Sequence, residues 1–92
     1  MKIVKIQKEE RTFNGTPYKY FSIFANDNGR RVVIGCSGST YIQVVDADTG
    51  EYISPLYRLH EFGLKAGDEI DVWYQDQSQR VAQIDFLKKV EA

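Results

Sequence analysis

Aromatic side chains alternate along the stretch GTPYKYFSIFAND, which runs from Gly15 to Asp27. In an extended strand, successive side chains point to opposite faces of the sheet. One face would carry Lys19, Phe21, Ile23 and Ala25, and the other would carry Tyr18, Tyr20, Ser22 and Phe24. Because a small domain buries one face of its sheet well, we expect Phe21, Ile23 and Ala25 in the core and Tyr18, Tyr20 and Phe24 outside.

The outer set has the chemistry that a single-stranded nucleic acid requires. Stacking of a base on an aromatic ring contributes about 1–3 kcal/mol, and cations hold the phosphates. The rings are those of Tyr18, Tyr20 and Phe24. The cations expected at the backbone are Lys5, Lys19, Arg30 and Arg31, with Lys8 and Arg11 nearby on the first strand. Since every base has a π-face, this pattern predicts non-catalytic binding with little sequence specificity.

An outward row of rings also has roles that involve no nucleic acid. Aromatic residues are favoured in strands for packing alone. A loop or helix of the same chain would cover such a row, or it would be buried in a homodimer or against a partner protein. The second hypothesis is therefore an interaction or assembly module. For Trp73, packing is a more common role than stacking on a ligand.

Motifs for catalysis or metal binding are incomplete in this sequence. The segment GCSGS has Ser39 where a nucleophile elbow needs glycine. Cys36 and His60 are the single cysteine and histidine, and nothing in the sequence pairs them or gives them metal-ligand spacing. DADTGE lacks the Gly and Glu positions of a calcium loop, and no Gly-Lys-Ser/Thr phosphate motif occurs. We therefore expect no enzyme activity, metal or small-molecule cofactor.

Composition indicates one soluble globular domain over residues 1–92, with 42% hydrophobic and 27% charged residues. The formal net charge of −1 argues against reliance on bulk positive charge. Residues 1–45 nevertheless carry seven basic and three acidic groups, whereas residues 46–92 carry five basic and ten acidic groups. This asymmetry is compatible with one basic face on a nearly neutral protein.

The sequence also predicts a location. No apolar run approaches the ~20 residues of a membrane helix, and the opening MKIVKIQKEE has no apolar core of a signal peptide. The lone Cys36 cannot form an internal disulfide. These features favour a cytoplasmic protein without membrane contact.

Turn signals divide the first half of the chain into three strands. We expect a first strand over Lys2–Phe13, with Val4 and Ile6 on one face and Ile3 and Lys5 on the other. Asn-Gly pairs at positions 14–15 and 28–29 predict hairpin turns. They bound a second strand over Pro17–Asn26 and precede a third over Arg30–Cys36. In the third strand Val32, Ile34 and Cys36 are expected inside, and Arg31, Val33 and Gly35 outside.

The second half predicts a strand pair around a turn at Asp46–Gly50, then a helix over Pro55–Phe62. Ser54 suits the helix N-cap and Gly63 its C-terminal end. A final hairpin follows, with these side chains expected inward: Ile70, Val72, Tyr74, Ala82, Ile84 and Phe86. This order resembles the OB-fold, a five-stranded Greek-key barrel that is all-β apart from one short helix. An SH3-like barrel is the alternative.

Three segments, MKIVKI, NGTPYKY and IDFLKKV, resemble the small single-stranded DNA-binding proteins of filamentous phages. The resemblance implies an OB-like barrel that acts as a dimer in the DNA replication of a phage or mobile element. In that family, hairpin tyrosines and phenylalanines hold the strand together with nearby lysines and arginines. The matching stretch here is Gly15-Thr16-Pro17-Tyr18, so the resemblance implies such a role for Tyr18 and Tyr20.

Overall fold

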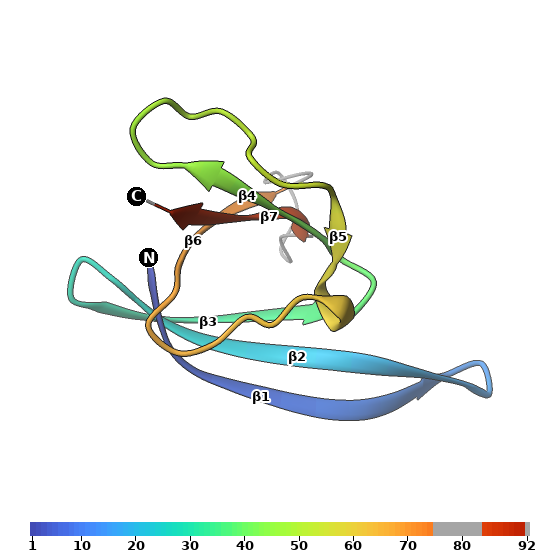
Figure 1. Cartoon of the computed structure of the whole chain (residues 1–92). Helices are drawn as coiled ribbons and strands as arrows, with labels where there is room; N and C mark the ends of the chain where they lie inside the picture. The colour runs from blue at the N-terminus through green and yellow to red at the C-terminus, as the bar shows by residue number, and fades with distance from the viewer. Residues whose placement is uncertain (75–83, 92) are drawn as a thin grey trace.

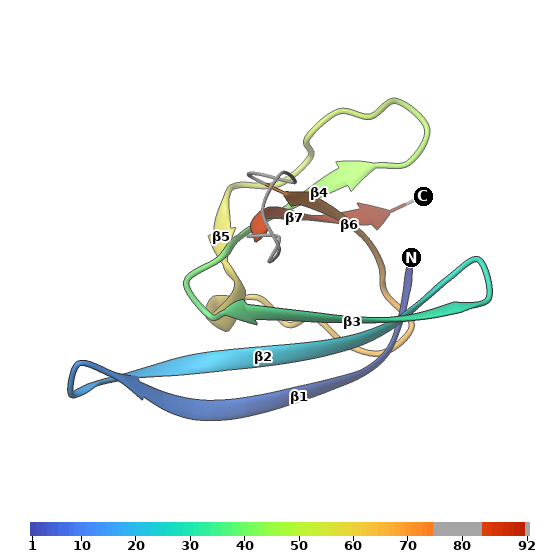
Figure 2. The same cartoon turned by 180° about the vertical axis from the view of Figure 1, so that it is seen from behind.

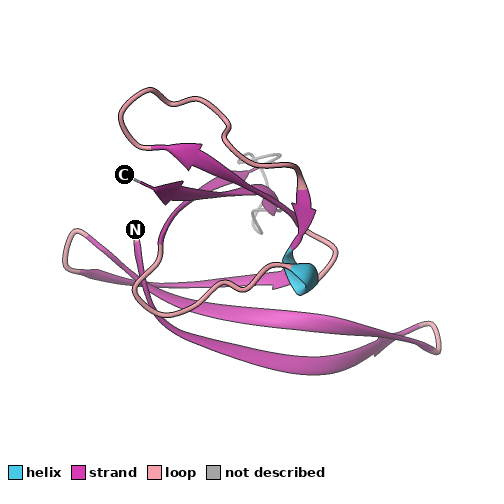
Figure 3. Ribbon diagram, viewed as in Figure 1, coloured by secondary structure: helices cyan, strands magenta, loops and turns pink. Residues whose placement is uncertain are grey.

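The computed structural model describes residues 1–74 and 84–91, and this part of the chain is mostly β-structure (Figure 1). A short 3₁₀ turn, η1, covers Leu59–Glu61 (Figure 3). The strands are β1 (Lys2–Phe13), β2 (Thr16–Asp27), β3 (Arg30–Ser37), β4 (Tyr41–Asp46), β5 (Tyr57–Arg58), β6 (Glu69–Tyr74) and β7 (Ile84–Glu91). The expectation of a mainly β protein is confirmed.

The strands form one open mixed sheet in the order β3-β2-β1-β6-β7-β4-β5. β1, β2 and β3 form an antiparallel meander, whereas β4 runs parallel to β7. The two parts of the sheet join where Lys2 of β1 pairs with Glu69 of β6. Figures 1 and 2 show that β1–β3 lie beneath β4, β6 and β7, so that the sheet folds back over itself.

The first two hairpins turn where the sequence predicts. Asn14 and Asn28 have φ angles of 50° and 52°, and the glycines after them have φ angles of 78° and 86°. Two consecutive residues with positive φ form the turn whose twist matches that of paired strands. These turns fix the register of β1, β2 and β3.

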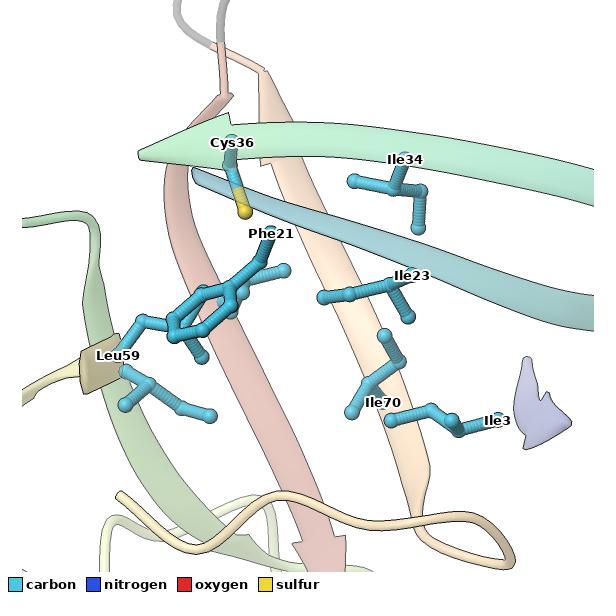
Figure 4. Close-up of a cluster of buried hydrophobic side chains, with 9 residues drawn as sticks. Ile3, Phe21, Ile23, Ile34, Cys36, Leu59 and Ile70 are labelled. Carbon is cyan, nitrogen blue, oxygen red and sulfur yellow. The ribbon is translucent and has the colours of Figure 1, made fainter. Parts of the chain in front are cut away.

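The core lies between the two layers of the sheet. Phe21, Ile23 and Ala25 of β2 are buried, which confirms the predicted inward set of this strand. Ile34 and Cys36 of β3 are buried as well, as expected, and Val32 packs against the core. Figure 4 shows several of these side chains pointing toward one another and toward Ile70 of β6.

The predicted faces of the first strand are wrong at its start. A β-bulge between Ile3 and Lys5 leaves Val4 without a partner on β2. Because a bulge adds one residue to one strand, it shifts the alternation of side chains beyond it. Ile3 and Ile6 therefore both contact the core, whereas Val4 is 62% exposed.

The predicted helix over Pro55–Phe62 is also wrong. Tyr57 and Arg58 pair with β4 instead, and the helical part is limited to η1. The Ser54 hydroxyl does not cap a helix, because it accepts a hydrogen bond from the Val44 N–H at 2.9 Å. Leu59 is buried, but Leu56 is 52% exposed, so only part of the expected apolar face reaches the core.

Two expectations for the other strands need correction. The predicted strand pair around Asp46 is reduced to a single bridge between Val45 and Tyr52, and β4 pairs mainly with β5 and β7. In β7 the fully buried side chain is Leu87, whereas Phe86 is half-buried. Ile70 and Val72 contact the core as predicted. The expected inward side chains of Tyr74, Ala82 and Ile84, and the Trp73 side chain, lie outside the part that the structure describes.

Candidate nucleic-acid interface

The face of β1–β3 that points away from the core, called the outer face below, carries most of the predicted site. Strand pairing places every second residue of β1, β2 and β3 on the same side of the sheet, opposite its partners on the neighbouring strands. The outer face includes Lys5, Gln7, Glu9, Arg11, Phe13, Thr16, Tyr18, Tyr20, Ser22, Phe24, Asn26, Arg31, Val33, Gly35 and Ser37. Tyr18, Tyr20 and Phe24 are half-buried, so all three predicted rings lie outside the core.

Tyr20 is the centre of a compact group on this face. The Arg11 guanidinium carbon lies over the Tyr20 ring, 3.7 Å from its centroid. Glu9 accepts hydrogen bonds from Arg11 Nε at 3.3 Å and from Arg11 Nη2 at 3.2 Å. The pKa of Arg11 is raised: desolvation acts to lower it, but the hydrogen bond and the negative charge of Glu9 outweigh that effect.

Phe24 lines a separate groove of about 700 Å³ at the other end of the outer face. The exposed side chains of Val4 and Val33 flank it, together with Lys5 and Arg31. Lys5 Nζ lies 5.7 Å from the centre of the Phe24 ring. The groove thus combines an apolar floor with two cations, and both cations were predicted from the sequence.

Two of the predicted cations, Lys19 and Arg30, do not lie on the outer face. Lys19 alternates with Tyr18 and Tyr20 along β2, and it lines a cavity of about 390 Å³ with Glu10 and His60. Arg30 is exposed beside the β2–β3 turn, where its backbone lies opposite that of Asp27 in the strand register. The structure therefore brings Lys5 and Arg31 close to a predicted ring, but not Lys19 or Arg30.

The sequence predicts neither Val4 nor Glu9 at this surface, and it predicts Arg11 only as a nearby cation of the first strand. The position of Arg11 follows from the turn at Asn14-Gly15, because counting back from that turn pairs Arg11 with Tyr18. Glu9 has the same parity as Arg11 and therefore faces the same way. The sequence does not predict that Val4 is exposed, because its exposure depends on the β-bulge.

The groups considered for catalysis are in different environments. Cys36 is buried, and this burial raises the pKa of its thiol to about 11, although a hydrogen bond with Thr40 acts in the opposite direction. His60 is exposed on η1. Within residues 1–74 and 84–91, no three His, Cys, Asp or Glu side chains gather in a way that would hold a metal ion.

None of the helical structure in those ranges has the length and apolarity to cross a bilayer.

Comparisons with protein-family models, with curated proteins and with solved structures find no match for this chain. The resemblance to the phage single-stranded DNA-binding proteins stays a prediction.

Proposed function

We propose that this chain binds single-stranded nucleic acid, most simply single-stranded DNA, on the outer face and without catalysis. The observation that carries the proposal is the pairing of rings with cations on one side of the sheet. Arg11 covers Tyr20 and Lys5 lies beside Phe24. Tyr18 adds a third ring on the same strand. Rings for bases and cations for phosphates are the two requirements of sequence-tolerant binding.

The order of the strands supports an OB-type barrel as the fold behind this function. β3 and β4 are joined by a short link at residues 38–40. If they are two halves of one bent strand, the sheet has five main strands with the third parallel to the fifth. η1 lies between β4 and β6, and its Leu59 enters the core, where an OB-fold places its helix. The second and third strands of that fold bind oligonucleotides.

The charge of the outer face fits a binding mode that depends on salt. Lys5, Arg11 and Arg31 lie on it, against a single acidic residue, Glu9, among the described positions. Release of counterions from a single strand gives a slope of log K against log salt of about −0.7 per phosphate contact. Three contacts would give a slope of about −2. The salt slope therefore reports how many of these cations contact phosphates.

A direct test is the titration of a labelled oligo(dT) with the wild-type chain and with Tyr20→Ala and Phe24→Ala. Each substitution should weaken binding at every salt concentration by about 1–3 kcal/mol, because each removes a ring on which the stacking of one base depends. Arg31→Ala should also flatten the salt slope by about 0.7. Tyr52→Ala is the matched control, because Tyr52 is an exposed tyrosine outside the outer face.

The proposal fails if the wild-type chain does not bind oligo(dT) at about 50 mM salt, where phosphate contacts are strong. It also fails if Tyr52→Ala weakens binding as much as Tyr20→Ala does.

The apolar groove favours a second candidate function, that of an assembly module. Val4 and Val33 are both 62% exposed and lie on either side of Phe24. Contiguous apolar patches of this kind are frequent at protein interfaces. In this case sedimentation would show a homodimer that dissociates when Tyr20 or Phe24 is replaced, and the oligonucleotide would not bind. A homodimer that still binds DNA would agree with the first proposal and with a cytoplasmic role in phage or mobile-element replication.

A further inference from the structure

The Tyr20 ring lies down across the sheet rather than standing up from it. Tyr20 is on β2, and a Cβ atom built on Gly35 of β3 would overlap the Tyr20 hydroxyl and lie 3.0 Å from Cζ. The phenol end of the ring therefore reaches over the backbone of the neighbouring strand. One face of the ring is turned toward the sheet as a result, and the other is turned outward.

The guanidinium of Arg11 lies over this ring, and we assign it to the outward face because the other face is turned toward the backbone at Gly35. Arg11 comes from β1, on the opposite side of β2 from Gly35. Its guanidinium carbon is 3.7 Å from the ring centroid, which is contact distance. A base that approaches the outer face at this position meets the guanidinium before it meets the tyrosine.

Glu9 holds the guanidinium in this position. Both Nε and Nη2 of Arg11 donate to Glu9 Oε2, so two of its in-plane donors are occupied. The plane of the guanidinium stays open above the ring, and Nη1 has no hydrogen-bond partner among the described residues. A planar cation fixed in this way can stack on a base and still donate to a phosphate.

We propose that the stacking surface at this position is the guanidinium of Arg11, supported by Tyr20 and positioned by Glu9. The ligand is an unpaired nucleobase of a single strand, so the inference rests on the proposed function. Gly35 belongs to the same arrangement, because any side chain there would displace the tyrosine on which Arg11 rests.

Arg11→Lys separates stacking from charge, because lysine keeps the charge but has no planar group. In a plot of log K against log salt, the slope reports the number of phosphate contacts. At about 1 M salt these contacts are largely screened, so the affinity that remains there comes mainly from interactions such as stacking. We expect Arg11→Lys to keep the wild-type slope and to lose about 5- to 150-fold in affinity at about 1 M salt, the loss of one stacked base.

Arg58→Lys is the matched control, since Arg58 also lies over a tyrosine ring, 3.9 Å from the Tyr41 centroid, but on β5 and away from the outer face. It should keep both the slope and the affinity at high salt. An oligonucleotide of equal length with abasic sites should bind the wild-type chain and Arg11→Lys equally. Equal binding of normal oligo(dT) by these two proteins at every salt concentration would overturn the inference, while the proposed function would stand.

Glu9→Gln tests the positioning of Arg11. Removal of the negative charge should strengthen binding at about 50 mM salt, where attraction to phosphates dominates. Loss of the ion pair should weaken binding at about 1 M salt, because Arg11 is no longer held over Tyr20. The wild-type and Glu9→Gln curves should therefore cross. Tighter binding by Glu9→Gln at all salt concentrations would show that Glu9 only competes for Arg11, and it would refute the positioning role.

Gly35→Ala gives a second, independent test. The new methyl group should displace Tyr20 and with it Arg11, so that affinity at about 1 M salt falls to the level of Arg11→Lys. A thermal melt checks that Gly35→Ala is still folded. Full affinity in the folded variant would contradict the supporting role of Tyr20.

Discussion

Gly35 and Cys36 are neighbours on β3, yet each is constrained by a different side of the sheet. Gly35 faces outward, where the Tyr20 ring occupies the space of a side chain. Cys36 faces inward and packs with Phe21 and Ile34 in the core. At the scale of the residue, the alternation along β3 therefore separates a position on the outer face from a position in the core.

The buried thiol of Cys36 makes stability depend on pH in the alkaline range. Burial raises its pKa from 9.0 to about 11, so the folded state favours the neutral thiol. This stabilisation is complete below pH 9 and is lost as pH rises toward 11. Urea denaturation of wild type and Cys36→Ala should show the stability difference between them shrinking by about 2 kcal/mol over that range. Parallel stability curves would contradict this assignment.

Residue-scale features were predictable where strand alternation alone decides them. The inward set of Phe21, Ile23 and Ala25 follows from their spacing on β2. The stack of Arg11 on Tyr20 depends on the register between two strands and on side-chain rotamers, which a single strand does not specify.

At the scale of the element, local sequence signals determine where the hairpin turns form. Contacts between distant segments determine the conformation of Pro55–Phe62 and the pairing of the later strands. Both Asn-Gly turns form because their backbone preferences are local. The segment Pro55–Phe62 has local helix signals, but pairing of Tyr57 and Arg58 with β4 overrides them. The parallel pairing of β4 with β7 joins segments far apart in the sequence, so no local pattern predicts it.

The β-bulge at Val4 can be tested by a pair of alanine substitutions. Ile3→Ala should cost about 2–5 kcal/mol, because Ile3 is buried in the core. Val4→Ala should change stability by less than about 0.5 kcal/mol, because Val4 is exposed. Urea denaturation measures both values. A regular strand with Val4 and Ile6 on the inner face would give the opposite ranking.

At the scale of the whole molecule, the core and the Arg11 end of the proposed interface draw on separate parts of the β1–β2 hairpin. The hairpin extends well beyond the other strands (Figure 1), within overall dimensions of 44 × 29 × 27 Å. The buried cluster and the partly buried side chains packed on it draw on Ile3, Ile6, Phe21 and Ile23 from this hairpin. They include no residue from positions 7–20. This projecting end, positions 7–20, is called the arm below, and it carries Arg11 and Tyr18.

A shortened arm should therefore fold but bind weakly. Deletion of residues 10–13 and 16–19 places Glu9 and Tyr20, which are already paired, on either side of Asn14-Gly15. Removal of four residues from each strand keeps the alternation of the ladder. The main structural cost is the hydrogen bond from the Gly38 N–H to the Lys19 carbonyl, about 0.5–1.5 kcal/mol.

The matched control is the shorter deletion of residues 12–13 and 16–17, which keeps Arg11 and Tyr18 as the pair beside the turn. Thermal melts should show a cooperative transition for both proteins, since neither loses a core side chain. In oligo(dT) titrations the longer deletion should lose at least about 5-fold in affinity, because it removes the Arg11 stack and the Tyr18 ring. The shorter deletion should bind like the full chain. Equal binding by both deletions would place the ligand on the Phe24 groove alone and exclude the arm from the site.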